Sequence, residues 1–90
     1  MRAKTLDEMY GDWCGSDDAP GPWVTWEEAR EQTGMTEMEL RDCAPSDYAA
    51  YADNLPTDAE AREDEFHRRL NLAWVLEIER RAHIVTSYHH

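Results

Sequence analysis

The C-terminal third of the chain is its longest stretch without a helix-breaking residue, since neither glycine nor proline occurs after Pro56. At about 100° per residue, most of the apolar side chains in this stretch fall on one broad face. They are Phe66, Leu70, Ala73, Trp74, Ile78, Ile84 and Val85. The pattern predicts one long helix over residues 58–85. Glu77 and Arg81 lie inside the stripe at the i,i+4 spacing that suits an ion pair.

A helix of this length is long for a small domain. About 27 residues extend for ~40 Å, whereas a domain of this size has a radius of gyration near ~13 Å. Apolar residues near the centre of the helix point to more than one side, so we expect a second chain to cover it there. The predicted partner interface consists of Phe66, Leu70, Leu72, Trp74, Val75, Leu76 and Ile78. The alternative is a helix that breaks near Asn71 and folds back.

Four Thr-x-x-Glu patterns mark the expected starts of helices. In such a capping box the threonine oxygen accepts a backbone N–H of the first turn, and the glutamate reaches back to the threonine N–H. The pairs are Thr5/Glu8, Thr25/Glu28, Thr36/Glu39 and Thr57/Glu60. Met35 and Leu40 also stand at the positions of a hydrophobic staple around the third box.

Glycine and proline set the expected ends of these helices. We predict helices over about 6–10, 26–33 and 37–43, a loop over 11–23 and a further helix that begins near Asp47. That further helix would present Tyr48, Tyr51, Ala52 and Leu55 on one face. The predicted fold is therefore all-α. It is a single domain over residues 1–90, with a helix-turn-helix-like pair at 25–43 and the long C-terminal helix.

The chain is strongly acidic, because twenty Asp and Glu outnumber nine Lys and Arg and give a formal charge of −11. The whole excess lies in residues 1–60. This charge argues against binding to the phosphate backbone of nucleic acids. It favours a basic protein partner, or imitation of nucleic acid. An acidic face formed by Glu37, Glu39 and Asp42 would meet such a partner, although a merely solvated acidic surface is the simpler interpretation.

No constellation of catalytic or metal-binding residues is evident in the sequence. The chain contains no nucleophile elbow, no Gly-rich phosphate loop and no Cys-x-x-Cys or His-x3-His pair. The available metal donors are Cys14, Cys43, His67, His83, His89 and His90. We predict no catalytic residue, no metal and no cofactor. No signal peptide or apolar run of ~20 residues is present, so we expect a cytoplasmic chain that does not enter a membrane.

Residues 25–42 read TWEEAREQTGMTEMELRD and resemble the helix-turn-helix of small regulators of the excisionase and MerR type. The matching positions are Thr25, Glu28, Ala29, Gly34, Thr36 and Leu40. The resemblance implies two short helices joined by a tight turn. Arg30 stands where a small residue usually packs, and the second helix is acidic, so we do not expect direct DNA binding.

A longer part of the chain resembles the N-terminal helical segment of the nitrile hydratase β subunit. That segment has a Trp–Glu helix, a glycine, an aromatic–Arg pair, a Pro-x-x-Tyr motif and an aromatic-led amphipathic helix. The corresponding residues are Trp26–Glu27, Gly34, Leu40–Arg41, Pro45 with Tyr48, and the helix 66–82. The spacings differ, with an acidic insert between Tyr48 and Phe66. The resemblance implies a non-catalytic subunit beside a separate, metal-bearing α subunit.

Taken together, these features favour a non-catalytic protein that acts by protein–protein interaction. The first hypothesis is a small or accessory subunit of a hetero-oligomer, covered by its partner along the long helix. The alternative is a helix-turn-helix-derived regulator or an acidic inhibitor that imitates nucleic acid and occupies a basic protein surface.

Overall fold

The computed structural model describes residues 19–84, and these residues form helices and their connections without any strand. In chain order the elements are α2 (Trp26–Thr33), α3 (Glu37–Asp42), the 3-10 helix η1 (Tyr48–Tyr51) and α4 (Ala59–Ala82). The all-α prediction is therefore confirmed. The helix predicted at 6–10 and most of the loop predicted at 11–23 lie outside the described residues.

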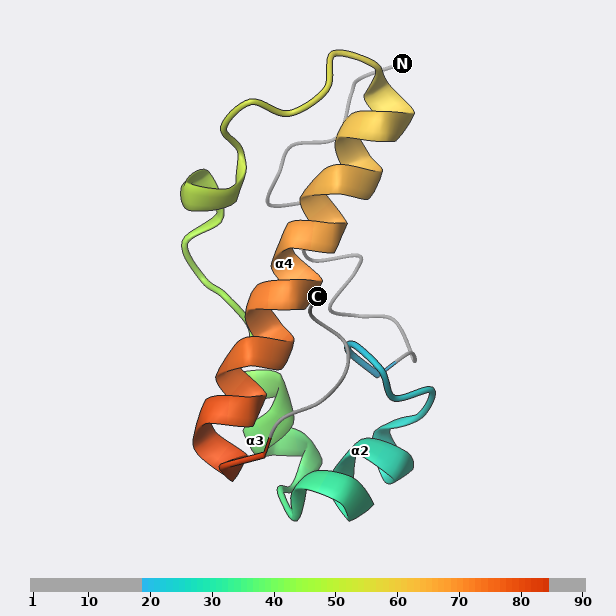
Figure 1. Ribbon diagram of the computed structural model, residues 1–90, viewed down its shortest axis with the longest axis vertical. Coiled ribbons are helices and arrows are strands. Elements are labelled where there is room, and N and C mark those ends of the chain that lie inside the picture. Colours follow the sequence, from blue (N-terminus) through green and yellow to red (C-terminus); the bar gives the residue numbers. More distant parts are fainter. Residues whose placement is uncertain (1–18, 85–90) are drawn as a thin grey trace.

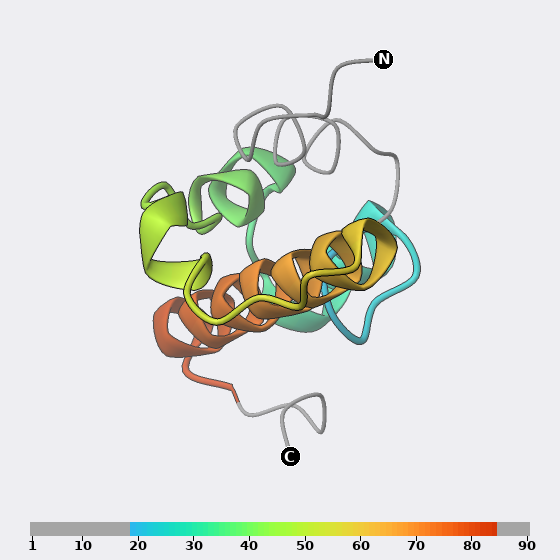
Figure 2. The same ribbon diagram turned by 90° about the horizontal axis from the view of Figure 1, so that it is seen from above.

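α4 is the axis around which the other elements are arranged. In Figure 1 α2 and α3 lie beside its C-terminal end, and residues 44–58 run back along it to its N-terminus. Figure 2 looks down on the same arrangement, with η1 and the segment before α2 on opposite sides of α4. The short elements are thus placed by their contacts with one long helix.

α2 and α3 form the predicted corner. Thr25 Oγ1 accepts the backbone N–H of Glu28 at the start of α2. Gly34 ends α2 in the left-handed conformation (φ 73°), with its N–H donated to the carbonyl of Arg30, a backbone state that glycine adopts without steric cost. α3 then begins at a complete capping box in which Thr36 and Glu39 satisfy each other's backbone N–H groups.

α4 is continuous over 24 residues, so the alternative of a break near Asn71 is wrong. Its N-cap is Asp58, whose side chain accepts the N–H of Ala61, and the capping box predicted at Thr57 does not form the cap. Aspartate is at least as good an N-cap as threonine, which explains the one-residue shift. The helix ends at His83, a left-handed residue with φ 57°.

The prediction of an α-helix from Asp47 is wrong, because the chain forms only η1 there, a single 3-10 turn of four residues. The Asp47 side chain makes no capping hydrogen bond, and Asn54 takes a positive φ of 55° shortly before Pro56. So short a segment lacks the length that a stable helix needs. Its apolar residues nevertheless share a surface, since Tyr48, Tyr51 and Leu55 pack on α4.

The core consists of two apolar clusters on α4. Phe66 and Leu70 form the first, beneath η1 and the residues that follow it. The second joins α4 to α2, α3 and the segment before α2, and it comprises Trp23, Ala29, Leu40, Cys43, Trp74, Val75 and Ile78. Both halves of α4 are thus covered by the chain itself. The length of this helix therefore does not by itself require a second chain.

Candidate functional site at the junction of α3 and α4

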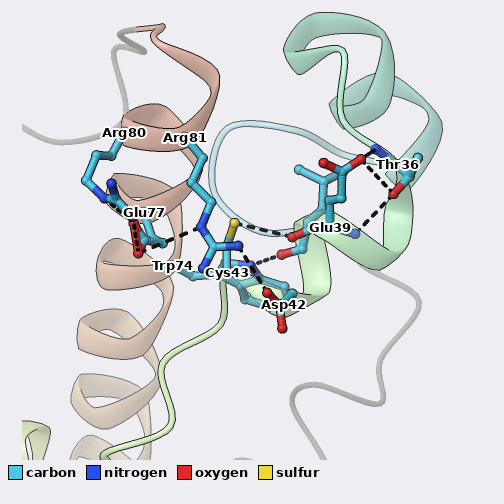
Figure 3. A network of polar contacts seen from close by, with 9 residues as sticks. Thr36, Glu39, Asp42, Cys43, Trp74, Glu77, Arg80 and Arg81 are labelled. Atoms are coloured by element: carbon cyan, nitrogen blue, oxygen red, sulfur yellow. Dashed lines mark hydrogen bonds and ion pairs between the residues drawn. The ribbon is translucent and has the colours of Figure 1, made fainter.

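A network of four charged side chains connects the end of α3 to the last turns of α4 (Figure 3). Arg81 donates to Asp42 at 3.1 Å, and its Nε lies 3.9 Å from Glu77. Glu77 also accepts from Arg80 at 2.5 Å, and this hydrogen bond is the main reason why the pKa of Glu77 is lowered. The predicted Glu77–Arg81 pair is present, but the shorter contacts of these residues are with Arg80 and Asp42.

Two further contacts lie beneath this network. The Trp74 indole N–H donates to the carbonyl of Leu40, at a buried position that joins α4 to α3. The Cys43 thiol donates to the carbonyl of Glu39. Burial raises the pKa of Cys43, with the Arg81 charge as the main opposing influence. Cys43 is therefore a neutral, buried thiol rather than a nucleophile, because the thiolate is the reactive form.

A cleft of about 350 Å³ opens beside the network, between α4 and the chain that leaves α3. Its walls include Asp42, Ser46, Tyr51, Ala73, Glu77 and Arg81. The two apolar clusters lie on either side of it along α4, since Tyr51 packs with one and Cys43 with the other. The cleft combines carboxylates, a guanidinium and hydroxyl groups, which suits recognition of a polar group and offers no base–nucleophile pair.

The three residues of the predicted acidic face lie on α3 or at its end, but each has a contact within the chain. Glu37 accepts from Arg41 at 3.1 Å, Glu39 completes the capping box, and Asp42 accepts from Arg81. Arg41 also lies over the Trp26 ring, 4.3 Å from its centroid. All three carboxylates thus have partners within the chain, and Asp42, with a 75% exposed side chain, is the more open of the two that form ion pairs.

The predicted partner interface requires a correction. Phe66, Leu70, Trp74, Val75 and Ile78 are all buried inside the chain. They face residues 44–58 or the α2–α3 corner, so they present no surface to a second chain in this fold.

The other two residues of that interface remain partly accessible. Leu72 is half-buried, and 44% of Leu76 is exposed. The accessible part of the predicted partner interface is thereby reduced to a small area on one side of α4.

A second polar cluster fixes the segment after η1 against α4. Glu65 accepts from both Arg68 and Arg69. Arg69 also donates to the backbone carbonyls of Tyr51 and Asp53. The two arginines, Arg68 first, lower the pKa of Glu65 to about 2. This cluster fixes the backbone of Tyr51, which forms part of the cleft wall. It was not predicted from the sequence.

One side chain that was not singled out from the sequence is the most exposed large apolar one among residues 19–84. Met38 on α3 is 82% exposed, whereas Leu40, two residues further, is fully buried. The helical period of α3 was the available signal, because residues about 200° apart face opposite sides.

The described part of the chain, residues 19–84, also bears on metal binding and on membrane insertion. No group of three or more His, Cys, Asp or Glu side chains in this range is arranged to hold a metal ion. Cys14, His89 and His90 lie outside it. Within the same range no helix has both the length and the apolar character needed to cross a membrane.

Comparisons with family models, with curated proteins and with solved structures gave no match. The likenesses to the excisionase and MerR helix-turn-helix and to the nitrile hydratase β subunit therefore stay predictions from the sequence.

Proposed function

We propose that this chain is a non-catalytic protein that binds a basic surface of another protein. The supporting observation is the way in which its positive charges are used. Between residues 19 and 84 there are fifteen carboxylates and seven arginines, which gives a formal charge of −8. Arg41, Arg68, Arg69, Arg80 and Arg81 all form ion pairs with carboxylates of the same chain.

These ion pairs involve four of the fifteen carboxylates between residues 19 and 84, so the excess of negative charge comes from the other eleven. Most of the eleven are exposed, including Glu27, Glu31 and Glu60. A surface of this kind attracts a basic partner over a distance of about one Debye length. It repels phosphate, which disfavours DNA as the ligand of α3.

The accessory-subunit hypothesis is compatible with this proposal, but it no longer rests on the apolar face of α4. The apolar residues of α4 that suggested a covering subunit are mostly buried within the chain itself. The excess of negative charge, rather than the apolar face of α4, then selects the partner. A nitrile hydratase-like assembly would need a basic surface on its metal-bearing α subunit.

The test is to isolate the protein with its native partner and to measure the affinity of the purified complex between 50 and 500 mM salt. We expect a partner with a basic surface and a dissociation constant that rises steeply with salt. A variant carrying Glu27→Gln, Glu31→Gln and Glu60→Gln should bind more weakly and lose part of the salt dependence. A complex insensitive to salt, or an isolated chain that has no partner at all, would contradict the proposal.

A further inference from the structure

We infer that the cleft between α3 and α4 accepts an arginine side chain of the basic partner, and that Arg81 occupies the same carboxylates in the free chain. The inference rests on the proposed function and assigns it a site. The cleft has a volume of about 350 Å³, which corresponds to about twelve water molecules at about 30 Å³ each. An extended arginine side chain has fewer non-hydrogen atoms than this number of water molecules, so the cleft is large enough to hold it.

The acceptor for the incoming group is Asp42, at the rim of the cleft. A carboxylate offers about four lone-pair positions. Within the described part of the chain, the Asp42 carboxylate accepts a hydrogen bond from Arg81 at Oδ2. Glu77, only 30% exposed, is already shared by Arg80 and Arg81. Asp42 therefore has both the exposure and the free lone pairs to accept a second cation.

The chain itself indicates which cation suits this position. Arg81 is held here by Asp42 at 3.1 Å and lies near Glu77, so a guanidinium is the group that the two carboxylates already bind. A guanidinium has five donors in a planar fork, whereas an ammonium is a compact point charge. A partner's arginine can bind Asp42 alongside Arg81, or displace it.

Arg81 is thus an internal competitor. It belongs to the same molecule and is therefore always close to Asp42, and it also repels an incoming cation. Removal of its charge should strengthen the binding of an external arginine, although Arg81 stabilises the free chain. A generally acidic surface without a defined site predicts much smaller effects from changes at Asp42 and Arg81.

The experiment uses the full chain, with tri-arginine and tri-lysine peptides as probes, and follows backbone amide shifts by NMR at 20 mM salt. Asp42→Asn should weaken tri-arginine binding about three- to tenfold, which corresponds to the loss of one charge-assisted contact. It should also abolish the peptide-induced shifts at Ser46 and Ala73. The control Asp64→Asn makes the same substitution at an exposed position near the other end of α4 and should change affinity less than about twofold.

A second pair of variants tests the competition. Arg81→Gln should tighten tri-arginine binding about three- to tenfold, whereas Arg62→Gln, with the same loss of charge near the other end of α4, should change it less than about twofold. Tri-arginine should bind more tightly than tri-lysine to the unmodified chain. Circular dichroism of each variant establishes that the helices are intact.

The outcomes separate this site from the broader proposal. Equal effects of Asp42→Asn and Asp64→Asn, or weaker binding by Arg81→Gln, would overturn the cleft while the chain remained a ligand of basic surfaces. Failure of every variant to bind either peptide would overturn the cleft and the proposed function together.

Discussion

Gly21 and Gly34 have nearly the same positive φ, 69° and 73°, but different surroundings. A Cβ at Gly21 would overlap Cγ2 of Val75, whereas a Cβ at Gly34 would meet nothing within 4 Å. Gly21 also donates its N–H to Asn71 at 3.1 Å. The close approach of its backbone to α4 therefore depends on the missing side chain.

Alanine at these two glycines should separate backbone strain from steric overlap. Gly34→Ala should lower the free energy of unfolding by about 1 kcal/mol, the cost of a left-handed alanine. Gly21→Ala should lower it by about 2–4 kcal/mol, because overpacking against Val75 adds to that cost. Urea unfolding of both variants measures the difference. Equal losses would show that the segment before α2 can move away from α4.

Glu65 should make the stability of the fold depend on pH in the acid range. Its pKa is about 2 in the folded chain, lowered from 4.5 by hydrogen bonds from Arg68 and then Arg69. Because the folded pKa is the lower one, the carboxylate stabilises the fold above about pH 4.5 and loses this effect as the pH falls towards 2.

Urea unfolding between pH 5 and pH 2.5, together with an NMR titration of the Glu65 carboxyl, measures this effect. Glu65→Gln should make stability depend less steeply on pH in this range. The control is Glu60→Gln, an exposed residue of the same helix, which should leave the slope nearly unchanged. An unaltered slope in Glu65→Gln would contradict the assignment.

At the scale of the element, one of the predicted capping boxes forms completely and another does not form the cap. Thr36 heads a complete capping box, whereas Asp58 rather than Thr57 caps α4. Thr36→Ala and Asp58→Ala should each lower the free energy of unfolding by about 0.5–2 kcal/mol. Thr57→Ala should change it by less than about 0.5 kcal/mol. Thermal unfolding checks all three, and a large loss in Thr57→Ala would restore the predicted cap.

The sequence was informative wherever the signal is local. Capping residues, Gly34 and the apolar period predicted α2, α3 and a continuous α4, since each depends on neighbours within about four residues. The course of residues 44–58 back along α4 has no such local signal. That course decides the burial of Phe66 and Leu70, so their assignment to a partner interface was wrong.

The candidate site illustrates the same limit. Glu77 and Arg81 are four residues apart and their pairing was predicted, but Arg81 makes its shorter contact with Asp42, 39 residues away. The cleft requires α3 and α4 to lie side by side. Sequence periodicity carries no information on that placement.

For the whole molecule, the question is whether the two apolar clusters unfold together. α4 is continuous between them, so loss of either cluster should destabilise the other. Leu70→Ala removes a fully buried side chain from the first cluster and should lower the free energy of unfolding by about 2–5 kcal/mol.

Tryptophan fluorescence reports on the second cluster, which includes Trp23 and Trp74, while circular dichroism reports on all helices. Both urea transitions should shift together in Leu70→Ala. The control Leu76→Ala alters an exposed residue of the same helix and should have a much smaller effect. A fluorescence transition that stays in place would mean that the halves of α4 unfold separately.

The dependence of every short element on α4 also bears on the synthesis of the protein. α4 is the last described element to leave the ribosome, and it supplies partners for residues far earlier in the chain, such as Gly21 and Leu40. α2 and α3 have eight and six residues, too few to persist as isolated helices. At about 5–20 residues per second, the nascent chain exposes Trp23 and Leu40 for seconds before their partners appear. Folding of residues 19–84 is therefore expected only after α4 has emerged, and fragments that lack α4 should be efficient substrates for chaperones and proteases.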